Sequence, residues 1–298
     1  MNVTAFFLIF ISVFMHAAWN FLGKKESPSS AFFLIAAVAG MLFCLPFIIF
    51  CGVAWQLIPP EFWKILIVSM AFNVLYYFSL ANGYRNGDIS LVYPLGRSLP
   101  VLLTAVITGI FNIGKELSWG AWIGMSVLFA GCLILPLQSW RDLKIKTYFS
   151  KVLFWVLLIS AGTTGYTIFD SMGMEILKEM SFRSGMFRAV FYMGLADATI
   201  AAGLTLPVVC SKRERSEFKR ILFSYSPYIA GVFTAAAYIL VLLAMNYVSN
   251  VCYIQAFRQM SLPLGMLAGI FLLKEPCSMP KIIGMILVVC GLITSTLV

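Results

Sequence analysis

The stretch IGMSVLFAGCLI at residues 123–134 recurs near the end of the chain as IGMILVVCGLI at residues 283–293. Both copies carry two glycines seven residues apart, which are Gly124 and Gly131 in the first and Gly284 and Gly291 in the second. Long apolar stretches of this kind are typical of helices. Because they recur with the same internal spacing, they indicate two copies of one structural unit.

Other landmarks recur in the same order ahead of these stretches. GIFNIGKE at 109–116 is matched by GIFLLKE at 269–275, and PLGRSLP at 94–100 by QAFRQMS at 255–261. The early part of each half also aligns, since His16, Trp19 and Asn20 correspond to Thr163, Tyr166 and Thr167 with a constant offset. Shared order at four places favours a repeat over chance similarity between apolar segments.

The composition places the chain in a membrane. Of 298 residues, 61% are hydrophobic and 11% are charged, whereas soluble domains carry roughly 45–50% apolar and about 25% charged residues. This excludes a soluble enzyme, a secreted disulfide scaffold and a disordered chain. The seven cysteines are odd in number and show no CxxC spacing. We therefore interpret them as small buried residues and expect neither disulfides nor a metal site.

A membrane crossing takes about 20 apolar residues, and the chain holds ten stretches of that kind. They fall at about 3–22, 30–51, 61–82, 89–112, 117–137, 150–174, 184–209, 222–245, 250–273 and 279–297. We interpret the first as a retained helix because it lacks a basic n-region and a cleavage site. The segment from Lys212 to Arg220 is expected to be a basic loop.

The expected fold class is an all-α integral membrane protein with ten transmembrane helices in two five-helix repeats, 1–140 and 148–298. A unit with five crossings must have its second copy inverted in the membrane. Inverted repeats are typical of secondary transporters, whose binding sites lie near the midplane between the halves.

Basic residues predict the orientation. Loops after odd-numbered stretches hold fourteen lysines and arginines, and those after even-numbered stretches hold five. The odd loops are therefore expected in the cytoplasm and both termini outside. This asymmetry accounts for the net charge of +9, so we expect no nucleic-acid partner.

Arg97 and Arg258 lie well inside apolar stretches, at matching places in the two halves. An arginine at membrane depth costs at least about 2.5–3.5 kcal/mol and usually faces a cavity or a partner. Two such guanidiniums can bind an anionic group of a substrate, since each offers a fork of donors. The alternative is a structural arginine that reaches the interface or pairs with a carboxylate.

Two polar stripes accompany the arginines. One carries Ser12, His16, Trp19 and Asn20, and the other carries Thr163, Tyr166, Thr167 and Asp170. His16, the single histidine, can relay protons or form a hydrogen bond between helices. Trp19 and Tyr166 can stack on a substrate or simply pack, and Tyr93 shares a helix face with Arg97.

Two carboxyl groups, Asp170 and Asp197, are the acidic residues deepest in apolar sequence. Either can couple transport to protons or neutralise an intramembrane arginine. His16, Asp170 and Asp197 are therefore the proton-coupling candidates. Arg97, Arg258, Trp19, Tyr93, Tyr166, His16 and Asn20 are the predicted substrate-binding residues.

The chain carries no GxSxG, HExxH or GxxxxGK[ST] motif. We therefore expect neither an enzyme nor a transporter that hydrolyses ATP, and no metal or cofactor.

HAAWNFLGKKES from His16, VYPLGRSLP around Arg97 and the segment from Ala256 to Pro276 resemble the EamA-type branch of the drug/metabolite transporter superfamily. The resemblance covers both halves and includes a His-x-x-Trp-Asn-x-x-x-Lys pattern at His16, Trp19, Asn20 and Lys24. It implies a 5+5 inverted repeat that works by alternating access on amino acids, metabolites, sugar derivatives or small amines.

The leading hypothesis is a multi-pass secondary transporter of the plasma membrane, or inner membrane of a Gram-negative cell, acting as a monomer or homodimer. Its substrate is expected to be a small polar metabolite, amino-acid-like or otherwise anionic, with protons as the candidate coupling ion. One alternative is a carrier of amines or quaternary-ammonium compounds held by aromatic rings. Another is a membrane scaffold or sensor that transports nothing.

Overall fold

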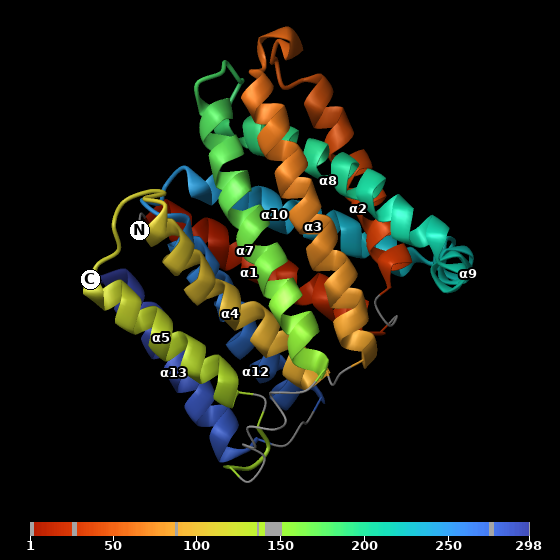
Figure 1. The fold of residues 1–298 in the computed structure, drawn as a ribbon. Coiled ribbons are helices and arrows are strands. Elements are labelled where there is room, and N and C mark those ends of the chain that lie inside the picture. Colours follow the sequence, from red (N-terminus) through yellow and green to blue (C-terminus); the bar gives the residue numbers. More distant parts are fainter. Residues whose placement is uncertain are drawn as a thin grey trace.

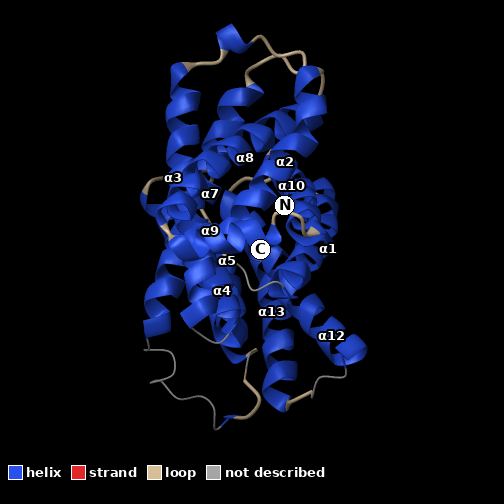
Figure 2. Cartoon of the chain, turned by 90° about the vertical axis from the view of Figure 1, so that its right-hand side faces the viewer, coloured by secondary structure: helices blue, strands red, loops and turns tan. Residues whose placement is uncertain are grey.

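A computed structural model describes residues 3–25, 29–86, 89–135, 137–140, 151–273 and 277–297. Within these ranges the regular structure is helical and no strand occurs (Figure 2). The long helices are α1 (Val3–Lys25), α2 (Ser30–Ile49), α3 (Pro60–Asn86), α4 (Ile89–Ile110), α5 (Trp119–Ile134), α7 (Lys151–Lys178), α8 (Gly185–Cys210), α10 (Tyr225–Met245), α12 (Ser261–Leu273) and α13 (Met279–Leu297). The shorter ones are α9 (Lys212–Ile221), α11 (Val251–Phe257) and the 3₁₀ turns Trp55–Leu57 and Arg258–Met260.

The protein is membrane-embedded. Five described segments are long and apolar enough to span a bilayer, namely Ser30–Ile49, Pro60–Asn86, Leu153–Lys178, Gly185–Cys210 and Tyr225–Met245. Shorter apolar helical segments are Val3–His16, Leu95–Ile110, Trp119–Ile134 and Met279–Ser295. Large apolar side chains such as Ile49, Ile110 and Leu206 are about 70% exposed. Apolar surface of this extent suits lipid and not water.

Each of the ten predicted apolar stretches coincides with helix, but the ninth is not one continuous helix. It is divided into α11, a 3₁₀ turn at Arg258–Met260, and α12. Pro263 explains the division because it has no N–H to donate to Gln259, one turn earlier. Arg258 therefore lies where the helix tightens.

The expected basic loop after α8 is instead the helix α9. Ser211 begins it by accepting a hydrogen bond from the backbone N–H of Glu214. Glu214 lies in the first turn, and Lys219 and Arg220 lie in the last. This arrangement of charges complements the helix dipole. The count of basic residues alone did not indicate a helix here.

The helices pack in pairs from opposite halves of the chain. α3 lies along α7, α1 along α10, α2 along α8 and α10, and α5 along α13 (Figure 1). α5 and α13 form one edge of the molecule, whereas α9 lies at the far end beside α2 and α8. The interior between these pairs is where the buried polar residues meet.

Candidate substrate-binding site

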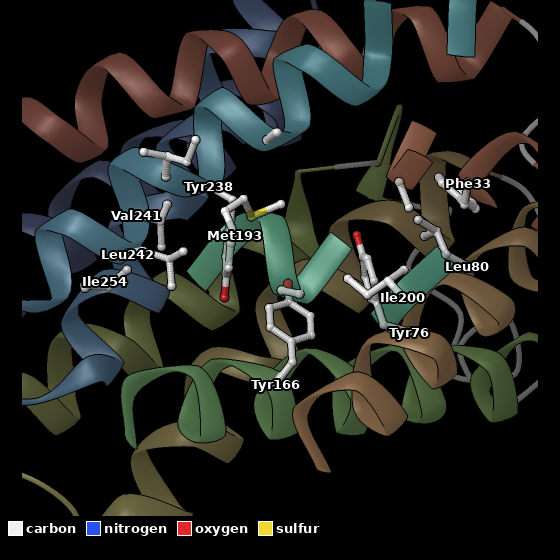
Figure 3. Close-up of a cluster of buried hydrophobic side chains, with 14 of the residues drawn as sticks. Phe33, Tyr76, Leu80, Tyr166, Met193, Ile200, Tyr238, Val241, Leu242 and Ile254 are labelled. Atoms are coloured by element: carbon white, nitrogen blue, oxygen red, sulfur yellow. The ribbon is translucent and has the colours of Figure 1, made fainter. Parts of the chain in front are cut away.

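A small cavity lies at the centre of the helices. It measures about 30 Å³, enough for roughly two water molecules. Its polar walls come from five helices and the 3₁₀ turn: His16, Asn73, Tyr76, Tyr77, Arg97, Tyr166, Asp170, Thr234, Tyr238 and Arg258. Figure 3 shows Tyr76, Tyr166 and Tyr238 around this region, with Met193 and Ile200 completing the wall. At this volume the cavity is too small for a metabolite, so a substrate can bind only after side chains or helices move.

Asp170 on α7 joins four helices at the cavity wall. Its carboxylate accepts hydrogen bonds from the hydroxyls of Tyr192 on α8 (2.7 Å), Tyr238 on α10 (2.5 Å) and Ser69 on α3. The side chain is completely buried. Hydrogen bonds to an ionised group are stronger than those between neutral groups, so three hydroxyl donors suit a negatively charged Asp170.

Glycines allow these donors to reach Asp170. A Cβ at Gly162 would lie 2.8 Å from the backbone nitrogen of Tyr76, so only glycine lets α7 and α3 approach this closely. A Cβ at Gly173 would lie 2.6 Å from the ring of Tyr192. Gly173 lies one turn after Asp170, and its bare surface therefore seats the ring whose hydroxyl bonds to that carboxylate.

Arg258 is buried in the cavity wall, and its guanidinium contacts neutral side chains. Its Nη1 donates to Oε1 of Gln255 (3.3 Å), and its Nη2 donates to the hydroxyl of Tyr166 (3.5 Å). Its guanidinium also lies 5.4 Å from the centre of the Tyr238 ring, a cation–π contact. Among the described residues Arg258 forms no ion pair, and its Nε has no hydrogen-bond partner.

Arg97 reaches the same place from α4. Its Nη2 donates to the backbone carbonyl of Arg258 (3.3 Å) and to the hydroxyl of Ser261 (3.0 Å). Ser261 in turn donates to the Arg258 carbonyl (2.9 Å). These bonds satisfy a carbonyl at the 3₁₀ turn, and irregular backbone at membrane depth requires such partners. The two arginines that the repeat singled out therefore meet at one site.

The structure gathers five of the predicted residues at one cavity: His16, Arg97, Tyr166, Asp170 and Arg258. Asp197 does not line it and faces a second, smaller cavity. The side chains of Trp19, Asn20 and Tyr93 lie outside the described residues. The roles assigned to all of these residues stay predictions.

Sequence reasoning missed the contribution of α3. Ser69, Asn73 and Tyr76 follow one face of this helix at intervals of four and three residues, and all three are buried. This spacing is the same signal that drew attention to His16 and Asp170. The role of Tyr238 carried no comparable signal, because tyrosines are common packing residues in membrane helices.

Comparisons with known proteins show a sequence similarity over part of the chain and a structural similarity over all of it. No protein-family model matches the chain. A segment of 111 residues is 25% identical to the "Uncharacterized transporter YwfM" of Bacillus subtilis (strain 168), and the match spans 37% of this chain and 37% of that protein. A solved chain described as "Crystal structure of protein" superposes with a TM-score of 0.65 at 13% identity, covering 100% of this chain and 99% of its own. At this identity the likeness concerns the fold alone, and that fold extends over the whole chain.

Proposed function

We propose that this protein is a secondary transporter of small anionic metabolites, amino-acid-like substrates among them, and that it belongs to the EamA-type branch of the drug/metabolite transporters. It works by alternating access in the plasma membrane. The name of the partial relative supports transport in general. The substrate class is argued from the central cavity.

The observation that carries the proposal is the buried guanidinium of Arg258. An isolated charge inside a protein costs far more than a paired one, and Arg258 has no ion-pair partner among the described residues. The cavity wall holds two arginines and one carboxylate, Asp170. Asp170 bonds to three hydroxyl groups and not to Arg258, so an anionic group of a substrate would neutralise the positive charge of Arg258.

An inverted repeat is part of the proposal, with halves at 1–140 and 148–298. The packing of α5 against α13 supports it. A Cβ at Gly124 would lie 2.6 Å from the carbonyl oxygen of Gly291, and a Cβ at Gly131 would lie 2.9 Å from the carbonyl oxygen of Gly284. Gly124 corresponds to Gly284 in the repeat, and Gly291 corresponds to Gly131. The contact between Gly124 and Gly291 therefore recurs between their equivalents, Gly284 and Gly131, as a twofold axis requires.

Helix pairing gives the same support. In a 5+5 repeat α1 corresponds to α7 and α3 to α10, so contact between α1 and α10 should be mirrored by contact between α7 and α3. Both contacts are extensive. Alternating access by rocking of the two halves is the motion that such a fold favours.

A second candidate function is transport of amines or quaternary-ammonium compounds. The specific observation in its favour is the set of tyrosine rings at the cavity, Tyr76, Tyr77, Tyr166 and Tyr238, with Asp170 as a counter-ion. Such rings attract cations. The two arginines oppose this alternative because they repel a cation from the same space.

The experiment compares ligands and then variants. Purified protein is heated with panels of anionic and cationic metabolites, and a compound that binds the folded state raises the unfolding temperature. We expect the stabilising compounds to be anionic and to bind at least about 30-fold more weakly to Arg258→Gln, because truncating one partner of a buried charge pair costs about 2–5 kcal/mol.

Arg188→Gln is the matched control, since Arg188 bonds to Asn246 (2.8 Å) and does not line the central cavity. If cations stabilise the protein and Arg258→Gln binds them more tightly, the amine carrier is correct instead. If no compound that binds is also moved across a liposome membrane, the protein is a scaffold or sensor.

A further inference from the structure

Two carboxyl groups are buried in the middle of the helices, and their surroundings are opposite. Asp170 accepts three hydrogen bonds from hydroxyl groups. Asp197 on α8 is 5% exposed, and no hydrogen bond or ion pair reaches it from the described residues. A pair of carboxyls in such different environments is suited to hold different protonation states.

The side chain of Asp197 enters a cavity of its own. This cavity has a volume of about 10 Å³, at the lower limit for one water molecule. Its other walls are Phe32, Phe33, Ala36, Ala37, Tyr77, Ala230, Gly231 and Thr234. Gly40 on α2 makes the room, because a methyl group at that position would overlap Oδ2 of Asp197.

No basic residue lines the Asp197 cavity among the described residues, and the basic residues of the neighbouring helix α9 lie outside it. The titratable groups near Asp197 include the thiol of Cys44 on α2 and the phenol of Tyr77 on α3. From α10 the cavity receives only Thr234 and small residues. A carboxylate in this setting would be an uncompensated charge, and such a group takes up a proton instead.

The two cavities adjoin each other. Tyr77 and Thr234 line both, so they separate Asp197 from the central site. The Asp197 cavity extends toward the first turns of α2 and α10, the ends that lie near α9. The exposed basic residues of α9 predict that this end faces the cytoplasm. Asp197 thus lies between that end and the substrate cavity.

The other two candidates fit a proton less well. His16 shares the central cavity with Arg97 and Arg258, so a proton on its imidazole would add a third positive charge there. Three hydroxyl groups donate hydrogen bonds to Asp170. A proton on this carboxyl would reduce its capacity to accept them, so protonation of Asp170 is unfavourable.

We propose that Asp197 is the proton-binding site of the transporter and that Asp170 stays a carboxylate that joins four helices. Asp197 takes a proton from water when its cavity opens to one side and returns it to water on the other side. The conformation described here is the protonated one. This inference rests on the transport function proposed above.

Infrared spectroscopy tests the assignment without a substrate. Protein in phosphatidylcholine vesicles at neutral pH is expected to show the C=O stretching band of a protonated carboxyl. The frequency of this band should shift in heavy water, because deuterium replaces the carboxyl proton. The band should vanish in Asp197→Asn and persist in Asp170→Asn. Persistence of the band in Asp197→Asn, or no such band in the native chain, would overturn the proposal.

Folding is a second readout. Because the proposal makes Asp197 neutral and free of hydrogen bonds, Asp197→Asn should unfold within a few degrees of the native chain, and a variant that fails to fold contradicts it. Once a substrate is known, Asp197→Asn should still exchange labelled for unlabelled substrate when the concentrations inside and outside the liposomes are equal. Its accumulation of substrate under a pH gradient should be at least about tenfold lower than that of the native chain. Transport that is absent from the native chain as well would instead contradict the proposed function, whatever the infrared result.

Discussion

Tyr238 contacts both Asp170 and Arg258 in the central cavity. Its hydroxyl donates to Asp170 (2.5 Å), and its ring lies 5.4 Å from the guanidinium of Arg258. Arg258 has no carboxylate of its own among the described residues, and the Tyr238 side chain links it to the buried carboxylate of Asp170. A substrate anion that approaches Arg258 also meets the Tyr238 ring.

Removing this hydroxyl tests the role of Asp170. Tyr238→Phe keeps the ring beside Arg258 but leaves Asp170 with one donor fewer, and hydrogen bonds to charged groups are worth about 1.5–3 kcal/mol. We expect the unfolding temperature to fall by several degrees. Tyr247→Phe is the control, because Tyr247 is 41% exposed and no hydrogen bond of its hydroxyl occurs in the described residues. Equal stability of the two variants would show that Asp170 does not depend on its hydroxyl donors.

The short helix α9 is anchored by a single acidic residue. Glu214 accepts from Nη2 of Arg85 at the end of α3 (2.6 Å) and from the backbone N–H of Ala31 at the start of α2 (3.1 Å). It is 5% exposed. One carboxylate therefore holds the ends of three helices together and satisfies a backbone donor at a helix N-terminus.

Glu214→Gln should lower the free energy of unfolding by about 2 kcal/mol, because it weakens one buried and one partly buried hydrogen bond to a charged group. Glu217→Gln lies on the same helix and breaks only the surface pair with Arg220. Such pairs contribute about 0–1 kcal/mol. Thermal unfolding of both variants in the same detergent checks the difference, and similar losses would contradict the anchoring role.

The contact between α5 and α13 depends on bare helix surfaces. A Cβ at Gly291 would lie 2.5 Å from the backbone nitrogen of Leu128 and 2.6 Å from the carbonyl oxygen of Gly124. Backbone atoms cannot move aside as the end of a flexible side chain can. The helices would have to separate, and overpacking of this kind costs about 1–3 kcal/mol.

Gly291→Ala should therefore destabilise the protein, whereas Gly109→Ala should not. At Gly109 on α4 the nearest atom to a new Cβ is 3.7 Å away, and alanine favours helix over glycine by about 0.5–1 kcal/mol. Opposite shifts of the unfolding temperature are expected. A Gly291→Ala variant as stable as the native chain would mean that α5 and α13 do not pack this closely.

Over the whole molecule, the apolar composition predicted the helices well because a bilayer leaves few alternatives for a long apolar segment. The break at Arg258 and the helix α9 were not predicted, since the first depends on Pro263 in its tertiary setting and the second on capping by Ser211. Arg97, Arg258 and Asp170 could be singled out because charge at membrane depth is costly. The contacts of these residues could not be predicted. They depend on how the helices pack, which decides whether Tyr192 and Tyr238 face Asp170.

The central claim is that Arg258 binds the anionic group of a transported substrate. The most direct test is uptake of a radiolabelled anionic metabolite, chosen by its thermal stabilisation of the protein, into liposomes that contain the native chain, Arg258→Gln or Arg188→Gln. We expect uptake by the native chain and by Arg188→Gln, and a loss of about 30-fold or more in Arg258→Gln, in line with a lost charge pair of about 2 kcal/mol or more. Undiminished uptake by Arg258→Gln would contradict the claim.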